Sequence, residues 1–164
     1  MSRYRPPPAR KSPYITAVGF AVLQGESRSL WKRRREVVAA LSAAAAEGDR
    51  SENAEYIYRK QQLRGLDRRI RYLEKRLGEL NVVEHPPEDR ERVYFGAWVT
   101  LEDENGQEQR LRIVGADEFD PERNWISIDA PLARALLKRA RDDEVEVRTP
   151  VGPRRYWIVT IDYE

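Results

Sequence analysis

Apolar residues recur alternately every three and four positions between residues 63 and 80. The series is Leu63, Leu66, Ile70, Leu73, Leu77 and Leu80, and mostly charged residues separate its members. This heptad spacing is typical of a helix that packs along one face against another helix. A weaker series with similar spacing runs upstream through Leu23, Leu30, Val37, Leu41 and Ala44. We therefore predict a coiled coil of two helices, near residues 16–47 and 52–80.

The connection between these two series is short and polar. Gly48 suits the left-handed conformation that ends a helix, and Asp49 or Ser51 suits the N-cap of the next one. Because a short connection forces two helices to run antiparallel, the sequence predicts a helical hairpin. At about 1.5 Å per residue its second helix would be roughly 42 Å long. We expect this arm, residues 14–81, to project.

The periodicity changes to two after His85-Pro86-Pro87, which ends the helix and predicts a stiff linker over residues 82–92. Asn105-Gly106 is a signal for a hairpin turn, and Pro131 begins a predicted helix that extends to about residue 139. Strands are predicted at 94–101, 110–114, 125–128, 144–149 and 156–163. The predicted fold class is thus α+β, in which residues 93–164 form a small antiparallel sheet with one helix.

Composition excludes several classes of site. The chain has no cysteine, which rules out disulfides and thiolate metal sites, and its one histidine, His85, lies in the predicted linker. No Gly-rich phosphate loop or dinucleotide fingerprint is present. No apolar stretch approaches the roughly 18 residues of a membrane span. Residues 1–13 are rich in Arg and Pro and predict a disordered basic tail, so we expect a soluble, cytoplasmic protein without a secretory signal.

Acidic residues gather at the predicted tip of the hairpin, where Glu47, Asp49, Glu52 and Glu55 fall within nine residues. Asp49 followed by Glu52 has the form of a capping box, which would make both residues structural. The same carboxylates are hard oxygen ligands that can help to hold Mg²⁺, provided that a partner supplies the remaining ligands. The spacing alone leaves both interpretations open.

Cations form a stripe along the second predicted helix, at Lys60, Arg64, Arg68, Arg71 and Lys75, and Arg59, Arg69 and Arg76 broaden it. Few acids lie nearby to balance them. Residues 1–89 hold 18 Lys and Arg against 12 Asp and Glu, whereas residues 90–164 hold 12 against 16. The stripe is either the solvated flank of a coiled coil or a surface for the phosphates of RNA or DNA.

Four runs of sequence resemble the GreA/GreB family of bacterial transcript cleavage factors. They are the tip at residues 48–56 (GDRSENAEY), residues 58–73, residues 94–99 (YFGAWV) and residues 126–137 (ISIDAPLARALL). The arginine-dense part at 67–73 looks like the GreB branch rather than the less basic GreA branch. The resemblance covers about residues 14–163, in the family's order and spacing.

This resemblance implies a coiled-coil arm and a C-terminal domain with an FKBP-like fold, in a protein that acts as a monomer. The domain would dock at the secondary channel of bacterial RNA polymerase, and the arm would place its tip beside the polymerase active site. Asp49 and Glu52 match the family's catalytic acidic pair, which would share a Mg²⁺ ion with the polymerase during cleavage of backtracked RNA. Glu55 has a weaker claim. The stripe would meet the nascent RNA 3′ end.

Two other functions remain open. A factor of the same family could occupy the polymerase channel without stimulating cleavage, and a free-standing RNA-binding chaperone could use the stripe alone. The acidic tip motif argues against the non-cleaving factor, and the chaperone is the remoter alternative. In that case the chain would lend metal ligands to the polymerase and would not be a nuclease by itself.

Overall fold

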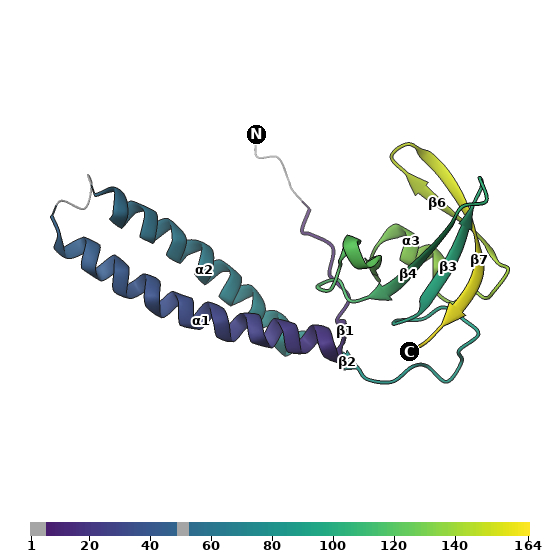
Figure 1. The fold of residues 1–164 in the computed structure, drawn as a ribbon, viewed down its shortest axis with the longest axis horizontal. Helices are drawn as coiled ribbons and strands as arrows, with labels where there is room; N and C mark the ends of the chain where they lie inside the picture. The colour runs from purple at the N-terminus through teal and green to yellow at the C-terminus, as the bar shows by residue number, and fades with distance from the viewer. Residues whose placement is uncertain (1–5, 49–52) are drawn as a thin grey trace. The chain divides into compact units, whose positions relative to one another are not determined.

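The computed structural model describes residues 6–48 and 53–164. They form two compact units, one of Phe20–Leu80 and one that joins Met1–Gly19 to Asn81–Glu164 (Figure 1). The N-terminal segment up to Gly19 therefore belongs to the C-terminal unit, although the helix that begins within it continues into the other unit. In the described residues no helix has the length and apolar character needed to cross a membrane.

The first unit is the predicted helical hairpin. Helix α1 spans Ala17–Ala46 and helix α2 spans Ala54–Glu79. The heptad seam of α2 lies inward, because Leu66, Ile70 and Leu73 are buried. The weaker series on α1 is buried at Leu23, Val37 and Ala44. The fold-class prediction of a long helical hairpin joined to a small sheet domain is confirmed.

A short parallel sheet, which was not predicted from the sequence, joins the residues just before α1 to those just after α2. Strand β1, Tyr14–Thr16, pairs with β2, Asn81–Val83, so that Ile15 lies opposite Val82. The backbone N–H of Asn81 also donates to the carbonyl of Pro13 at 2.7 Å. Strand β2 thus contains residues 82 and 83, which the sequence analysis placed in the linker. Three-residue strands are too short to show a period of two.

The sheet of the C-terminal unit has five strands in the order β5-β4-β3-β7-β6. Strands β3 (Trp98–Asp103), β4 (Glu108–Val114), β6 (Glu144–Thr149) and β7 (Gly152–Asp162) pair antiparallel with their neighbours. Strand β5 (Trp125–Ser127) instead runs parallel to β4. The sheet is therefore mixed and not wholly antiparallel, because the 3₁₀ turn η1, Pro121–Arg123, lies in a connection that carries the chain back before β5 begins.

The core of this unit lies between the sheet and helix α3, Pro131–Leu136. Val99, Leu101, Ile113 and Ile158 from the strands pack in one cluster with Leu136 of the helix. The helix ends earlier than the predicted residue 139. Its chain turns away at Lys138, whose φ of 68° is left-handed, and the backbone of residues 138 and 139 bonds to Val93 instead of continuing the helix. Tertiary hydrogen bonds therefore override helix propensity here.

Glu118 connects the start of α1 to the loop after β4. Its buried carboxylate accepts hydrogen bonds from the backbone N–H and the hydroxyl of Thr16 and from the N–H of Gly115 at 2.8 Å. Thr16 in turn caps α1, because its hydroxyl oxygen accepts from the N–H of Gly19 at 3.0 Å. A Cβ atom at Gly19 would lie 2.1 Å from a Glu118 oxygen, so the close approach requires glycine there. The first turn of α1 is thereby fixed within the C-terminal unit.

Candidate functional site

The hairpin tip is described on both sides of its centre. Asp49, Glu52 and Ser51 lie outside the described residues, so their predicted roles at the site remain predictions. Gly48 has a φ of 138°, which agrees with its predicted place as the glycine that follows the first helix. Helix α2 begins beyond the acidic pair, at Ala54.

Asn53 is the N-cap of α2. Its side-chain oxygen accepts a hydrogen bond from the backbone N–H of Tyr56 at 3.1 Å, while its amide nitrogen donates to the carbonyl of Ala44 in α1 at 2.7 Å. One side chain thus caps the second helix and ties it to the end of the first. The N-cap of α2 is therefore Asn53 and not the predicted Asp49 or Ser51, while the capping-box contacts predicted for Asp49 and Glu52 lie outside the described residues.

Substitution of Asn53 by Ala should lower the free energy of unfolding of the hairpin by about 1–2 kcal/mol, because an N-cap bond alone contributes about 1 kcal/mol. Asn53→Asp is the matched control, since it keeps the capping oxygen and loses the donor to Ala44. We expect a smaller loss for Asp than for Ala in urea unfolding followed by circular dichroism. Equal stability of the Ala variant and the native protein would show that Asn53 does not hold the tip.

Glu55 lies in the first turn of α2 and has a local partner. Its Oε1 is 2.7 Å from Nε of Arg59, one helical turn along. This ion pair, together with the favourable place of an acid near a helix N-terminus, accounts for Glu55 without a metal. In the described part of the chain no three or more metal-ligating side chains come together. The assignment of Asp49 and Glu52 as ligands of a Mg²⁺ ion, which prefers oxygen ligands of this type, stays a prediction.

Ion pairs within the hairpin neutralise several arginines. Nε of Arg34 is 2.6 Å from Oδ1 of Asp67, across the two helices. Arg69 reaches Glu26 across the same interface with two hydrogen bonds, at 2.7 and 3.0 Å. Arg59 pairs with Glu55 as described, and Arg76 is buried. Arg59, Arg69 and Arg76, which broadened the predicted stripe, are therefore less available to an external anion.

The five stripe residues differ from these three arginines in their availability to an external anion. All five are exposed, and none forms an ion pair with another described residue. At about 100° per residue they fall within an arc of about 80°, whose centre is about 150° from the seam. From Lys60 to Lys75 the stripe rises roughly 22 Å. Arg71 donates to the carbonyl of Asp67 at 3.3 Å, and the ammonium of Lys60 is 5.9 Å from the ring of Tyr56. The hairpin thus separates its paired cations from a continuous positive face.

A second set of cations, on α1, was not singled out from the sequence. Arg28, Lys32 and Arg35 are exposed and have no ion pair among the described residues. They share the face of α1 that lies away from its buried series. The signal was the run of four basic residues at 32–35, from which the pairing of Arg34 with Asp67 could not be read. This α1 set provides a control for the stripe.

The chain matches both the N-terminal and the C-terminal part of one protein family. A profile of the N-terminal part of a transcription elongation factor matches residues 13–82, and a profile of the GreA/GreB C-terminal part matches residues 87–163. The chain belongs to the GreA/GreB family of transcription elongation factors.

Its relatives include proteins named transcription elongation factor GreB. The one from Pseudomonas aeruginosa is 57% identical over 99% of this chain and 98% of the relative, and the one from Xanthomonas axonopodis is 56% identical over the same shares. Among solved structures, a GreA/GreB elongation factor from Nitrosomonas europaea is 24% identical, with a TM-score of 0.42 over 93% of this chain and 100% of that one.

Proposed function

We propose that this chain binds a bacterial RNA polymerase at its secondary channel and stimulates the polymerase's own Mg²⁺-dependent cleavage of backtracked nascent RNA. The observation that carries the proposal is the N-cap of α2. Because Asn53 caps the helix and anchors it to Ala44, the adjacent acids Asp49 and Glu52 are not required for capping. Carboxylates in the connection between the two helices of a hairpin, in a family of elongation factors, are suited to act on a partner's substrate.

Asp49 and Glu52 would be the ligands that this chain contributes to a Mg²⁺ ion shared with the polymerase. When bound, such an ion lowers the pKa of its water and stabilises charge on a phosphate. The chain's own residues would support these ligands, because Asn53 fixes the start of α2 and the buried seam keeps the two helices together. Two carboxylates form an incomplete site, so the chain alone would not be a nuclease.

The stripe would bind the phosphates of the RNA that a backtracked polymerase extrudes. Its cations are exposed and point away from the seam, whereas the cations that pair with acids hold the hairpin together. Released counterions make such contacts favourable and sensitive to salt. The predicted C-terminal domain, residues 93–164, would dock on the polymerase.

Halted transcription complexes with a labelled nascent RNA test this function directly. We expect cleavage of the RNA to accelerate when the chain is added to a backtracked complex, and no cleavage when free RNA is incubated with the chain and Mg²⁺. The matched control is the Asp49→Asn, Glu52→Gln double variant, which should bind the polymerase without accelerating cleavage.

The outcomes distinguish the proposal from its alternatives. If the chain competes for the channel but leaves the cleavage rate unchanged, it is a non-cleaving regulator of the polymerase. Cleavage of free RNA that disappears in the double variant would make the chain a nuclease and contradict the shared metal site. RNA binding without any effect on the polymerase would favour the chaperone.

A further inference from the structure

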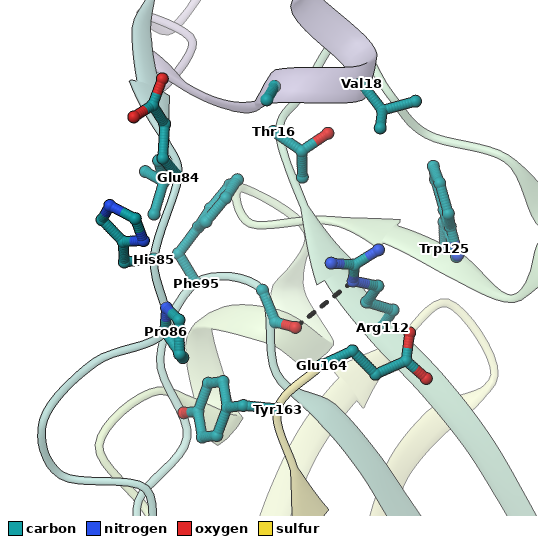
Figure 2. A pocket seen from close by; sticks show the side chains of 13 residues that line it. Thr16, Val18, Glu84, His85, Pro86, Phe95, Arg112, Trp125, Tyr163 and Glu164 are labelled. Carbon is teal, nitrogen blue, oxygen red and sulfur yellow. Dashed lines mark hydrogen bonds between the residues drawn. The ribbon is translucent and has the colours of Figure 1, made fainter.

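The C-terminal unit contains a pocket of about 200 Å³ whose walls come from several separate segments of the chain. The first turn of α1 contributes Val18, the segment after β2 contributes His85, and the sheet region contributes Phe95, Arg112 and Trp125 (Figure 2). All of its lining residues belong to the same compact unit. The tip and the stripe belong to the other unit, and neither of the functions above uses the pocket.

Arg112 is the cation of this pocket, and the sheet holds its guanidinium in place. Its Nε donates to the carbonyl of Gly96 at 3.3 Å, which is the dashed bond of Figure 2. The guanidinium carbon lies 5.4 Å from the ring centre of Trp125 and 5.8 Å from that of Trp98, so aromatic rings from two neighbouring strands flank it. Such cation–π contacts order the side chain before any ligand binds.

The bond to Gly96 uses only Nε of Arg112. The terminal nitrogens of Arg112 have no acceptor among the described residues. No ion pair of the described residues includes Arg112 either, although the nearby Arg110 and Arg123 have Asp162 and Asp120 as partners. A half-buried guanidinium with a fixed plane and one free edge, formed by its two terminal nitrogens, is suited to bind a carboxylate or phosphate through two parallel hydrogen bonds.

The other groups that line the pocket include one hydroxyl that is already hydrogen-bonded and several apolar side chains. The hydroxyl of Tyr163 is already used, since it donates to the carbonyl of Arg92 and accepts from the N–H of Tyr94. Burial raises the pKa of Tyr163, so this hydroxyl stays protonated and keeps both bonds. Phe95, Trp125 and Val18 supply apolar surface around Arg112.

Size and charge together select the anion. The volume is below the roughly 300–1,000 Å³ of pockets for drug-sized ligands, so a single side chain fits better than a nucleotide. Glu84 and Glu164 also line the pocket, and their charges oppose a doubly charged phosphate more strongly than a singly charged carboxylate. We propose that this pocket binds the carboxylate of an Asp or Glu side chain on a protein partner, with Arg112 as the recognition residue.

The test uses the whole chain and two short peptides, N-acetyl-Asp-Leu-amide and N-acetyl-Asn-Leu-amide. The signal is the NMR resonance of the Trp125 indole N–H, assigned by comparison with a Trp125→Phe variant. We expect a saturable shift with the Asp peptide, in the millimolar range, and binding by the Asn peptide at least about tenfold weaker, because the amide loses the charge-assisted bonds.

Matched variants assign the effect to Arg112. Arg112→Gln should weaken binding of the Asp peptide at least about tenfold, because Gln can keep the bond to Gly96 without the charge. Arg123→Gln is the control, since the guanidinium of Arg123 also lies over the Trp125 ring, at 5.2 Å, but does not line the pocket. It should bind the peptide as the native chain does.

A second variant guards against loss of folding. Val18→Glu adds a carboxylate at the mouth of the pocket, in the first turn of α1, where an acid stabilises a helix. This variant should stay folded and yet bind the Asp peptide at least about tenfold less tightly, through repulsion. No saturable shift with the Asp peptide, or equal binding by both peptides, would overturn the proposal. Tighter binding of inorganic phosphate than of the Asp peptide would replace the protein partner with a phosphate ligand.

Discussion

Replacement of Asp49 by Asn, or of Glu52 by Gln, is expected to lower polymerase-dependent RNA cleavage by about a hundredfold or more. The amide keeps the size and shape of each side chain but removes the anionic ligand, and removal of one group that stabilises a transition state costs about 10²–10³ in rate. The Mg²⁺ concentration needed for half-maximal cleavage should rise in both variants. Titration of Mg²⁺ in halted complexes measures both effects.

The thermal stability of the same variants should remain that of the native chain, and the structure extends this expectation to alanine. If either acid capped α2, alanine would cost about 1 kcal/mol. Asn53 is the cap, however, so Asp49→Ala and Glu52→Ala should also be silent in unfolding, while Asn53→Ala is not. If the variants lost thermal stability as well as cleavage, both acids would have a structural role. Near-normal cleavage by the Asn and Gln variants would exclude them as metal ligands.

The parts of the fold that could be predicted are those with a long, regular pattern. The seam of α2 repeats over six positions, so its buried residues Leu66, Ile70 and Leu73 follow from spacing alone. The Asn105-Gly106 turn was also predictable, because Gly106, with a φ of 75°, adopts a conformation that few other residues reach. Local chemistry determines both features.

The parts that were missed depend on residues far apart in the chain. Ser51, Asn53 and Asp49 are all good N-cap residues, and propensity does not choose among them. The choice of Asn53 comes with its bond to Ala44 on the opposite helix. The pairing of β1 with β2 and the parallel direction of β5 are likewise tertiary facts that segments of three residues cannot encode.

At the candidate site, too, local patterns could be predicted and contacts between distant residues could not. The sequence placed eight cations of α2 in one basic region, but it could not show that Arg69 pairs with Glu26 or that Arg76 is buried. Arg112 was missed because a single arginine in a strand has no distinctive spacing. Its significance arises only when the sheet places Trp98 and Trp125 beside it.

Charge reversal of the stripe, Arg64→Glu with Arg68→Glu, is expected to reduce cleavage of long extruded RNAs by about tenfold at low salt. RNAs extruded by only about two nucleotides should be cleaved almost normally. Arg64 lies roughly 16 Å along α2 from its N-cap, so a short RNA does not reach it. The comparison of long and short substrates in one polymerase preparation measures the difference.

The matched control is Arg28→Glu with Lys32→Glu on α1, which makes the same change of net charge at two exposed cations that are also without ion pairs in the described residues. If the RNA follows the stripe, this control variant should change the cleavage of long and short extruded RNAs to nearly the same extent. For the stripe variant, the slope of the logarithm of the RNA-binding constant against the logarithm of salt concentration should become shallower by about 0.7 for each lost contact with single-stranded RNA. Equal loss on both substrates, or equal effects of the two double variants, would mean that net charge or docking, and not a defined phosphate path along α2, accounts for the effect.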